Sequence, residues 1–165
     1  MELVSQSLIP AVEAFPPVMG TRVVIVEDEA VVALHLNHAL TGLGYTVAGT
    51  AASGAHALKL VEEVFPDVIL MDINIRGEMD GIDTAKMIPR YLHIPVIYLT
   101  AYSEDTTLKR AADTNPYGYL IKPFLDREVH ATIKMALERS RADEAVRENE
   151  ALLFRALCTT PISDC

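Results

Sequence analysis

Four consecutive apolar residues, Val68 to Met71, stand between a Pro-Asp pair and the acid Asp72, and a glycine-containing turn follows. A continuous apolar run of this length, bounded by turn residues, is typical of a strand buried on both faces, as in a parallel sheet. A carboxylate at the end of such a strand is costly to bury unless a cation or a hydrogen-bond donor accompanies it. The sequence therefore predicts a partner for Asp72 elsewhere in the chain.

Further apolar segments alternate with segments of helical pattern along the chain. Ser53 and Asp80 are placed to cap two of the helices, and the last helix begins near Asp126 and is much longer than the others. Alternation with short connections predicts parallel strands joined by right-handed crossovers, which is a doubly wound α/β fold with a five-stranded sheet. The predicted strands are 22–26, 45–50, 68–72, 96–100 and 117–121, and the predicted helices are 30–40, 53–64, 80–88, 103–115 and one from 126 onward.

Polar residues follow four of the five predicted strands. In a doubly wound sheet the functional residues lie beyond the carboxyl ends of the strands, and the flavodoxin-like order 2-1-3-4-5 makes the first and third strands neighbours. Three carboxylates gathered there repel one another unless a cation balances them, and ligands that are all oxygen favour Mg²⁺. The sequence predicts a magnesium site in which an aspartate attacks a phosphoryl group whose oxygens a hydroxyl and an ammonium group bind. The residues concerned are Glu27, Asp28, Asp72, Thr100 and Lys122.

Five short motifs together resemble the receiver domain of two-component response regulators, over about residues 21–139. The resemblance implies that Asp72 accepts a phosphoryl group from a histidine kinase or a phosphotransfer protein, so that the chain is a signalling domain rather than an enzyme with a separate substrate. It also implies that Asp28, Asp72 and the main-chain carbonyl of Asn74 bind Mg²⁺, with Glu27 acting through a metal-bound water. The motifs are Val26-Glu27-Asp28-Glu29, Met71-Asp72-Ile73-Asn74, Met79-Asp80-Gly81, Leu99-Thr100-Ala101 and Gly118-Tyr119-Leu120-Ile121-Lys122-Pro123-Phe124.

The same resemblance implies how the site is switched and reset. Thr100 moves toward the phosphoryl group, and Tyr119 moves into the space that it leaves. Asn74 and Tyr102, each two residues beyond a site residue, influence how long the phosphorylated state lasts. The bond between Lys122 and Pro123 is expected to be cis, an isomer that is found almost only before proline.

Two other proteins of similar fold fit the sequence less well. A flavodoxin binds the flavin phosphate with a loop rich in Ser, Thr and Gly after the first strand, where this chain has the acids Glu27, Asp28 and Glu29. A phosphatase of the haloacid dehalogenase type needs an aspartate as general acid two residues after its nucleophile, where Asn74 stands and cannot transfer a proton. A degenerate receiver that only binds partners is disfavoured because every chemical residue is present.

The composition of the chain argues against several other classes of protein. With 165 residues, one domain and an appendage are expected, and a net charge of −9 argues against non-specific binding of nucleic acid. No apolar run approaches a membrane span. Three prolines interrupt the first 20 residues and no basic residue precedes them, so these residues are expected to form a flexible leader rather than a secretory signal. Two cysteines near the C-terminus, Cys158 and Cys165, are expected to be free thiols in the cytoplasm.

The last segment, residues 140–165, is expected to be a charged helical linker. A weak heptad seam makes a dimeric coiled coil an open alternative to a solvated helix. Residues 149–157, followed by Thr160-Pro161, resemble the start of a PAS sensor domain. That resemblance implies that the chain is the N-terminal receiver fragment of a hybrid sensor histidine kinase or of another PAS-containing signalling protein. The seam consists of Ala142, Val146, Leu153 and Ala156, and Arg139 and Asn149 interrupt it.

Overall fold

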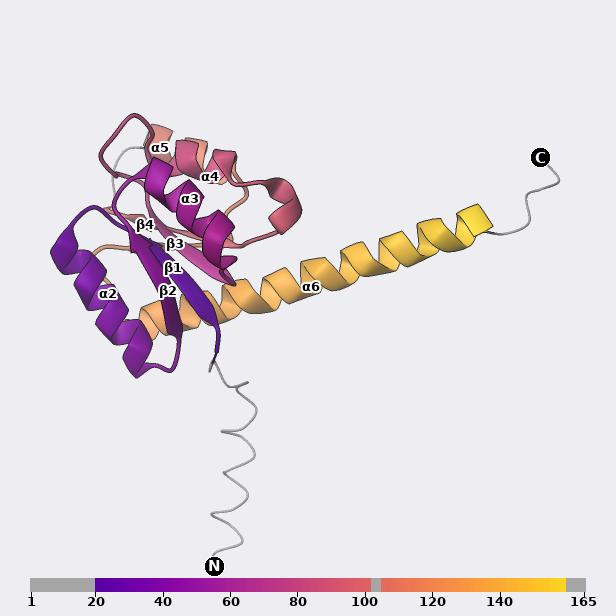
Figure 1. Cartoon of the computed structure of the whole chain (residues 1–165), viewed down its shortest axis with the longest axis horizontal. Coiled ribbons are helices and arrows are strands. Elements are labelled where there is room, and N and C mark those ends of the chain that lie inside the picture. Colours follow the sequence, from indigo (N-terminus) through magenta and orange to yellow (C-terminus); the bar gives the residue numbers. More distant parts are fainter. Residues whose placement is uncertain (1–19, 102–104, 160–165) are drawn as a thin grey trace, which may run out of the picture.

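The computed structural model describes residues 20–101 and 105–159. Residues 1–19 of the predicted leader, Tyr102 and the last six residues lie outside this range, so the expectations for them stay predictions. Within the range, the elements alternate as the sequence predicts, and a long C-terminal helix leaves the body of the domain (Figure 1).

Five parallel strands form one sheet in the order β2-β1-β3-β4-β5, which confirms the flavodoxin-like topology. The central position of β3 explains its apolar run, because all five of its residues are buried. The register pairs Val26 with Met71 and Asp72 with Leu99, so the strand ends that carry polar residues are level with one another. The strands are β1 (Arg22–Val26), β2 (Thr46–Ala51), β3 (Val68–Asp72), β4 (Val96–Thr100) and β5 (Gly118–Ile121).

Helices cover both faces of the sheet, with α2 and α6 on one face and α3, α4 and α5 on the other (Figure 1). The predicted caps are present: Ser53 Oγ accepts a hydrogen bond from the His56 amide at 3.2 Å, and Asp80 Oδ1 accepts one from the Asp83 amide at 2.8 Å. A short 3-10 turn, η1, was not predicted. The helical elements are α2 (Ala30–Gly42), α3 (Gly54–Val64), α4 (Gly81–Met87), η1 (Arg90–Leu92), α5 (Asp105–Ala112) and α6 (Asp126–Thr159).

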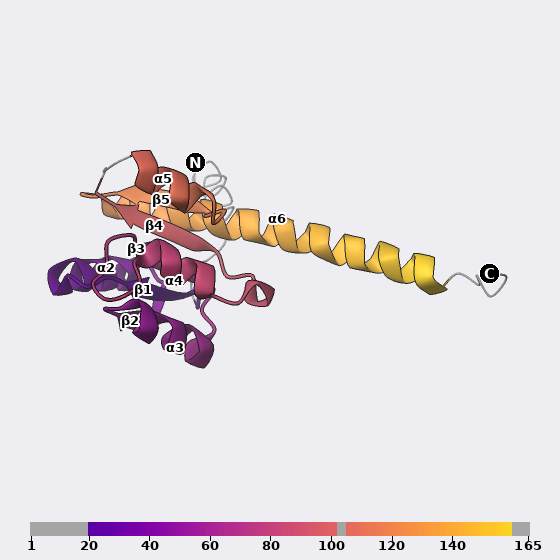
Figure 2. The same ribbon diagram turned by 90° about the horizontal axis from the view of Figure 1, so that it is seen from above.

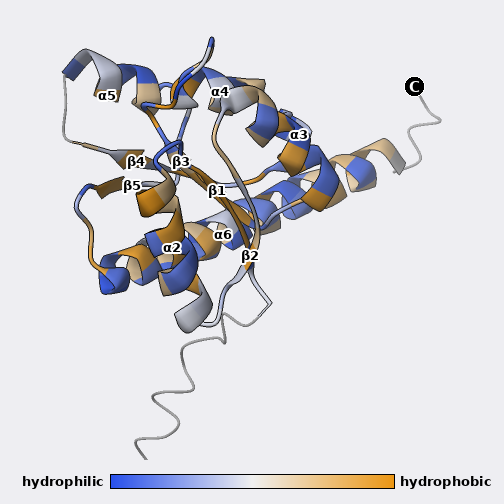
Figure 3. Ribbon diagram, turned by 60° about the vertical axis from the view of Figure 1, so that its left-hand side comes forward, coloured by the Kyte–Doolittle hydropathy of each residue, from blue (hydrophilic) through white to orange (hydrophobic). Residues whose placement is uncertain are grey.

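Alternating strand residues form two separate cores, one on each face of the sheet. In β3, Val68 and Leu70 pack under α2 and α6, whereas Ile69 and Met71 pack under α3, α4 and α5. Side chains of successive strand residues point to opposite faces, so one apolar strand can supply both cores. Figure 3 shows the result as hydrophobic strands between helices whose outward faces are hydrophilic.

Helix α6 has a packed half and a protruding half (Figure 2). Val129, Ile133 and Ala136 are fully buried against the sheet. Where the helix leaves the body, Tyr117 donates a hydrogen bond to Asp143 Oδ2 at 2.5 Å and its ring lies 4.8 Å below the Arg139 guanidinium. Both contacts couple the start of β5 to the direction of the protruding half. Among the described residues, neither α6 nor any shorter helix combines the length and the apolar character that a membrane span requires.

Candidate functional site

The polar residues predicted at the strand ends lie together at the carboxyl edge of the sheet. Glu27 follows β1, Asp72 and Thr100 end β3 and β4, and Lys122 follows β5. Glu27, Asp72 and Thr100 are only 3–4% exposed. The parallel register therefore creates a buried polar cluster from residues that are up to 95 positions apart in the chain.

Lys122 neutralises two of the buried carboxylates. Its Nζ donates to Asp72 Oδ2 at 2.7 Å and to Glu27 Oε2 at 2.9 Å. Burial on its own would lower the pKa of Lys122, but these two acceptors outweigh it and raise that pKa above its ordinary value. Lys122 is therefore held as a cation between Asp72 and Glu27.

Glu27 shows that one cation does not balance the cluster. Burial, followed by its contact with Asp72, raises the pKa of Glu27 from 4.5 to about 7, although the Lys122 ammonium and the Glu29 amide act in the opposite direction. The Glu29 amide donates to Glu27 Oε1 at 3.1 Å. The raised pKa means that the site gains stability from a further positive charge, supplied by a proton or by a metal ion.

Asp28 is held by a residue that the sequence analysis missed. The Arg76 amide donates to Asp28 Oδ2 at 3.0 Å, and Arg76 Nε lies 3.3 Å from the same oxygen. The Asp28 side chain is 10% exposed, whereas that of Arg76 is 84% exposed. No local pattern marks Arg76, because only the folded path of the loop after β3 brings it to β1.

Three carboxylates in the site fit a divalent metal ion. Glu27, Asp28 and Asp72 each offer one oxygen, and these oxygens lie within 4.8 Å of one another. Asp72 Oδ1 also accepts a hydrogen bond from the Asn74 amide at 3.0 Å, which places the main chain of Asn74 beside the same cluster. Oxygen ligands and an unbalanced negative charge are the features that favour Mg²⁺.

Thr100 and Tyr119 face a common hollow beside the site. A cavity of about 370 Å³ is lined by Thr100, Leu108, Tyr119 and Ile121. Tyr119 is 38% exposed, and its ring centroid lies 6.1 Å from that of the buried Tyr98. The hollow therefore connects the buried hydroxyl of Thr100 with a half-open aromatic side chain on β5. The bond before Pro123, next to this strand, is cis as predicted.

This chain is similar to known response regulators. The family model of the response regulator receiver domain matches residues 23–134. The transcriptional regulatory protein PdtaR of Mycobacterium tuberculosis is 36% identical over 138 residues, which are 84% of this chain and 67% of PdtaR. The chain spans only about half the length of two other curated transcriptional regulators that it matches.

Two solved structures extend the resemblance to the fold. The receiver domain of a modulated diguanylate cyclase from Desulfovibrio desulfuricans is 34% identical, with a TM-score of 0.71, and the match covers 74% of this chain and 97% of that one. The N-terminal domain of a response regulator/sensory box/GGDEF protein from Carboxydothermus hydrogenoformans is 33% identical, with a TM-score of 0.68. This match covers 74% of the present chain and 98% of the Carboxydothermus domain. With the family model matching most of the chain, this protein belongs to the response regulator receiver domain family.

Proposed function

We propose that this receiver domain accepts a phosphoryl group on Asp72 in a two-component phosphorelay and transmits the change to α6. The observation that carries the proposal is the setting of the Asp72 carboxylate. One oxygen accepts from Lys122 Nζ at 2.7 Å, the other accepts from the Asn74 amide at 3.0 Å, and two further acids complete a set of metal ligands. A nucleophile, an ammonium group and a cation site within one cluster are the components that phosphoryl transfer requires.

The reaction exchanges one bond to phosphorus for another. An Asp72 oxygen forms the new P–O bond, and the bond from phosphorus to the donor's imidazole nitrogen or acyl oxygen breaks, leaving the electron pair on the donor. Lys122, already a cation, would pair with a phosphoryl oxygen, and the buried Thr100 hydroxyl would donate to another. The chain would thus promote only its own phosphorylation and dephosphorylation.

Mg²⁺ would be held by Asp28, Asp72 and the main-chain carbonyl of Asn74, with Glu27 acting through a water molecule. When bound, the ion supplies positive charge against the phosphoryl oxygens and the acidic cluster. Arg76 would keep Asp28 oriented through its amide and its Nε. Glu27, whose pKa is raised to about 7 by burial and by its contact with Asp72, would be ionised once the ion is present.

Thr100 and Tyr119 would form the switch. A phosphoryl group adds negative charge and acceptor oxygens beside Thr100, so its hydroxyl would turn toward the site. Tyr119, which lines the same cavity of about 370 Å³, would then move inward. Asn74 and Tyr102 would set the lifetime of the phosphorylated state by limiting access of water to the phosphoryl group. If Tyr102 has this role, Tyr102→Ala should change the rate of dephosphorylation.

The phosphodonor would be a histidine kinase or a phosphotransfer protein in the cytoplasm. Two apolar side chains of the first turns of α2, Val31 and Leu34, are 80% and 70% exposed, and they follow the site loop that contains Asp28. Leu125, after Lys122, is 53% exposed. Exposed apolar side chains beside the acidic cluster suit a helical partner that must present a phosphohistidine to Asp72.

The output would pass through α6, in one of two settings. As a separate response regulator, the chain would pair with a second copy through α6, where Val146 and Leu153 are 55% and 63% exposed. As the receiver part of a hybrid kinase or another PAS-containing protein, it would hand the signal to the domain that follows. The sensory-box protein from Carboxydothermus hydrogenoformans, with its receiver at the N-terminus, favours this second setting.

Beryllofluoride tests the site without a phosphodonor, because it mimics an aspartyl phosphate. Wild-type protein should bind it only with Mg²⁺, giving a protein-bound ¹⁹F signal and shifted amide resonances for Thr100 and Lys122. Asp72→Asn should show neither change. A bound signal of equal intensity in that variant would contradict the proposed acceptor.

A further inference from the structure

A second concave site lies at the opposite end of the sheet from the acidic cluster. It has a volume of about 540 Å³, within the range of roughly 300–1,000 Å³ that is usual for small-molecule sites. Val96, the first residue of β4, lies in its wall, whereas Thr100, the last residue of β4, belongs to the acidic site. The two sites are therefore separated by the length of β4.

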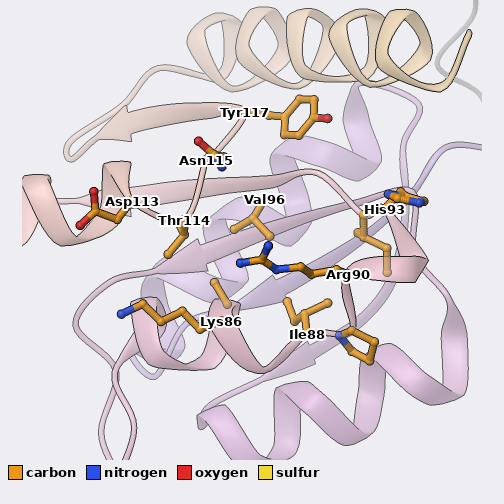
Figure 4. Close-up of a pocket in the computed structure, with 12 residues that line it drawn as sticks. Lys86, Ile88, Arg90, His93, Val96, Asp113, Thr114, Asn115 and Tyr117 are labelled. Atoms are coloured by element: carbon orange, nitrogen blue, oxygen red, sulfur yellow. The ribbon is translucent and has the colours of Figure 1, made fainter. Parts of the chain in front are cut away.

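The charge in this pocket is opposite to that of the rest of the chain. Its charged lining residues are Lys86, Arg90 and Asp113, an excess of one positive charge in a protein of net charge −9, and the imidazole of His93 adds a group that can become positive. Figure 4 shows the Arg90 side chain lying across the middle of the pocket, while Asp113 lies at its edge. Arg90 forms no ion pair with any residue in 20–101 or 105–159.

The surroundings of Arg90 are partly apolar and partly polar. Ile88 and Val96 lie on either side of its side chain, and Thr114 and Asn115 face it from the loop before β5 (Figure 4). A guanidinium group presents its donors in a planar fork that fits the oxygens of a phosphate or a carboxylate. The apolar walls would accommodate a flat organic group attached to that oxyanion.

One wall of the pocket is connected to the switch. Thr114 Oγ1 lies 2.7 Å from the hydroxyl of Tyr98, which is a fully buried residue. The Tyr98 ring in turn contacts the Tyr119 ring, with centroids 6.1 Å apart and planes at 36°. A ligand that moves Thr114 would displace the Tyr98 hydroxyl and so bias the position of Tyr119.

We propose that this pocket is a second ligand site, in which Arg90 binds the oxyanion of a small molecule with a phosphate or carboxylate group on a flat apolar body, and that its occupancy is coupled to Tyr119 through Thr114 and Tyr98. Binding at this pocket does not depend on the chemistry of Asp72. Only the coupling rests on the proposed role of Tyr119 as the switch. The two parts can therefore be tested separately.

The binding test uses ¹⁵N NMR titration of the full chain, without a phosphodonor, with four probes. Adenosine monophosphate and benzoate carry an oxyanion on a flat body, inorganic phosphate is the oxyanion alone, and adenosine is the body alone. The proposal predicts saturable shifts at the Arg90 and Thr114 amides for one or both of the first two probes, with weaker binding of the last two. The probe that binds distinguishes a phosphate from a carboxylate ligand.

Variants decide whether Arg90 is the anchor. Arg90→Ala should weaken binding about tenfold or more, since a charge-assisted bidentate contact is lost. Arg127→Ala, an exposed arginine on α6 outside the pocket, should leave it unchanged. The site is overturned if no probe gives saturable shifts, if adenosine binds as tightly as its monophosphate and benzoate does not bind, or if Arg90→Ala binds like the wild type.

Thr114→Val tests the coupling, because it removes the hydroxyl that reaches Tyr98 and nearly preserves the shape of the side chain. Ligand binding should be retained, and the ligand-induced shift of the Tyr119 resonances should be lost. An unchanged Tyr119 response in this variant, or no response in the wild type at saturation, would refute the coupling and leave the result for Arg90 standing. Phosphorylation at Asp72 enters neither measurement, so a failure here is distinct from a failure of the proposed acceptor.

Discussion

Gly81 and Asp72 are in direct main-chain contact, because a Cβ atom at position 81 would lie 2.0 Å from the main-chain oxygen of Asp72. The Gly81 amide also donates to the Ile73 carbonyl at 2.8 Å. The first turn of α4 therefore packs directly against the main chain of Asp72, the proposed phosphoacceptor. A side chain at this position would push α4 away from the end of β3.

Gly81→Ala is therefore expected to lower the free energy of unfolding by about 3 kcal/mol, the upper part of the usual range for overpacking. Urea unfolding followed by circular dichroism measures the change. Gly42→Ala is the matched control, since no atom outside its chain neighbours and the backbone of its own helix lies within 4 Å of a Cβ at position 42, and the helical position is expected to gain slight stability. Equal stability of the two variants would show that the backbone contact at Gly81 is unimportant.

The raised pKa of Glu27 predicts that the stability of the folded protein falls as the pH rises, and that Mg²⁺ reverses this loss. Its pKa is about 7 in the folded protein and about 4.5 when unperturbed, so between these values the folded state binds more protons than the unfolded chain. The stability that comes from protonation of Glu27 in the folded state is fully present below about pH 4.5 and is lost as the pH rises through about 7. Without Mg²⁺, the free energy of unfolding should fall across this window by at most about 3 kcal/mol.

Urea unfolding between pH 5 and pH 8 measures this loss, with and without Mg²⁺. Glu27→Gln should remove most of the slope, and saturating Mg²⁺ should restore stability at pH 8 in the wild type. A wild-type slope that survives in Glu27→Gln would assign the pH dependence to other groups.

Most of the site was predictable because its residues lie at strand ends, and parallel strands bring those ends to one edge. Asp72 and Lys122, 50 positions apart, meet for this reason. Arg76 was not predictable, because its bond to Asp28 depends on the path of an irregular loop. The link from Tyr117 to Asp143 was missed in the same way, since the register of α6 against the sheet is set by tertiary packing.

Element boundaries were predicted less accurately than element types. The first helix was expected to end at about Leu40, with Gly42 and Gly44 as suitable residues for its end; it continues to Gly42, and the chain turns at Gly44, which has a φ of 97° that favours glycine. The helix before β5 ends at Ala112 rather than near Asn115. The short turn at Arg90–Leu92 has too few residues to give a periodic pattern, so the sequence did not indicate it.

Thr100→Ala separates the switch from the acceptor. The variant should still accept a phosphoryl group or beryllofluoride at Asp72, because Lys122 and the acidic cluster are intact. Without the hydroxyl, activation should no longer change amide hydrogen exchange in β5, α5 and α6. Thr106→Ala, at an exposed position of α5, is the control. If Thr100→Ala responds as strongly as the wild type, the signal leaves the site by another route.

The exposed apolar side chains on the protruding half of α6 predict that the protein self-associates through this helix. Its 16 residues beyond Asp143 extend roughly 24 Å, enough for a short coiled coil around Val146 and Leu153. Leu153→Glu should reduce dimer formation in light-scattering measurements, whereas Ala151→Glu, which lies outside the predicted seam, should not. A wild-type protein that stays monomeric at high concentration with beryllofluoride would exclude this route of output.

Phosphorylation of Asp72 tests the central claim most directly. Wild-type protein incubated with acetyl phosphate and Mg²⁺ should gain the mass of one phosphoryl group, located by peptide mapping to the segment that contains Asp72. Asp72→Asn and wild-type protein in excess chelator should gain none, while Asp113→Asn, at an exposed position far from the site, should be labelled normally. Stable labelling of Asp72→Asn, or equal labelling of the wild type in excess chelator, would contradict the account.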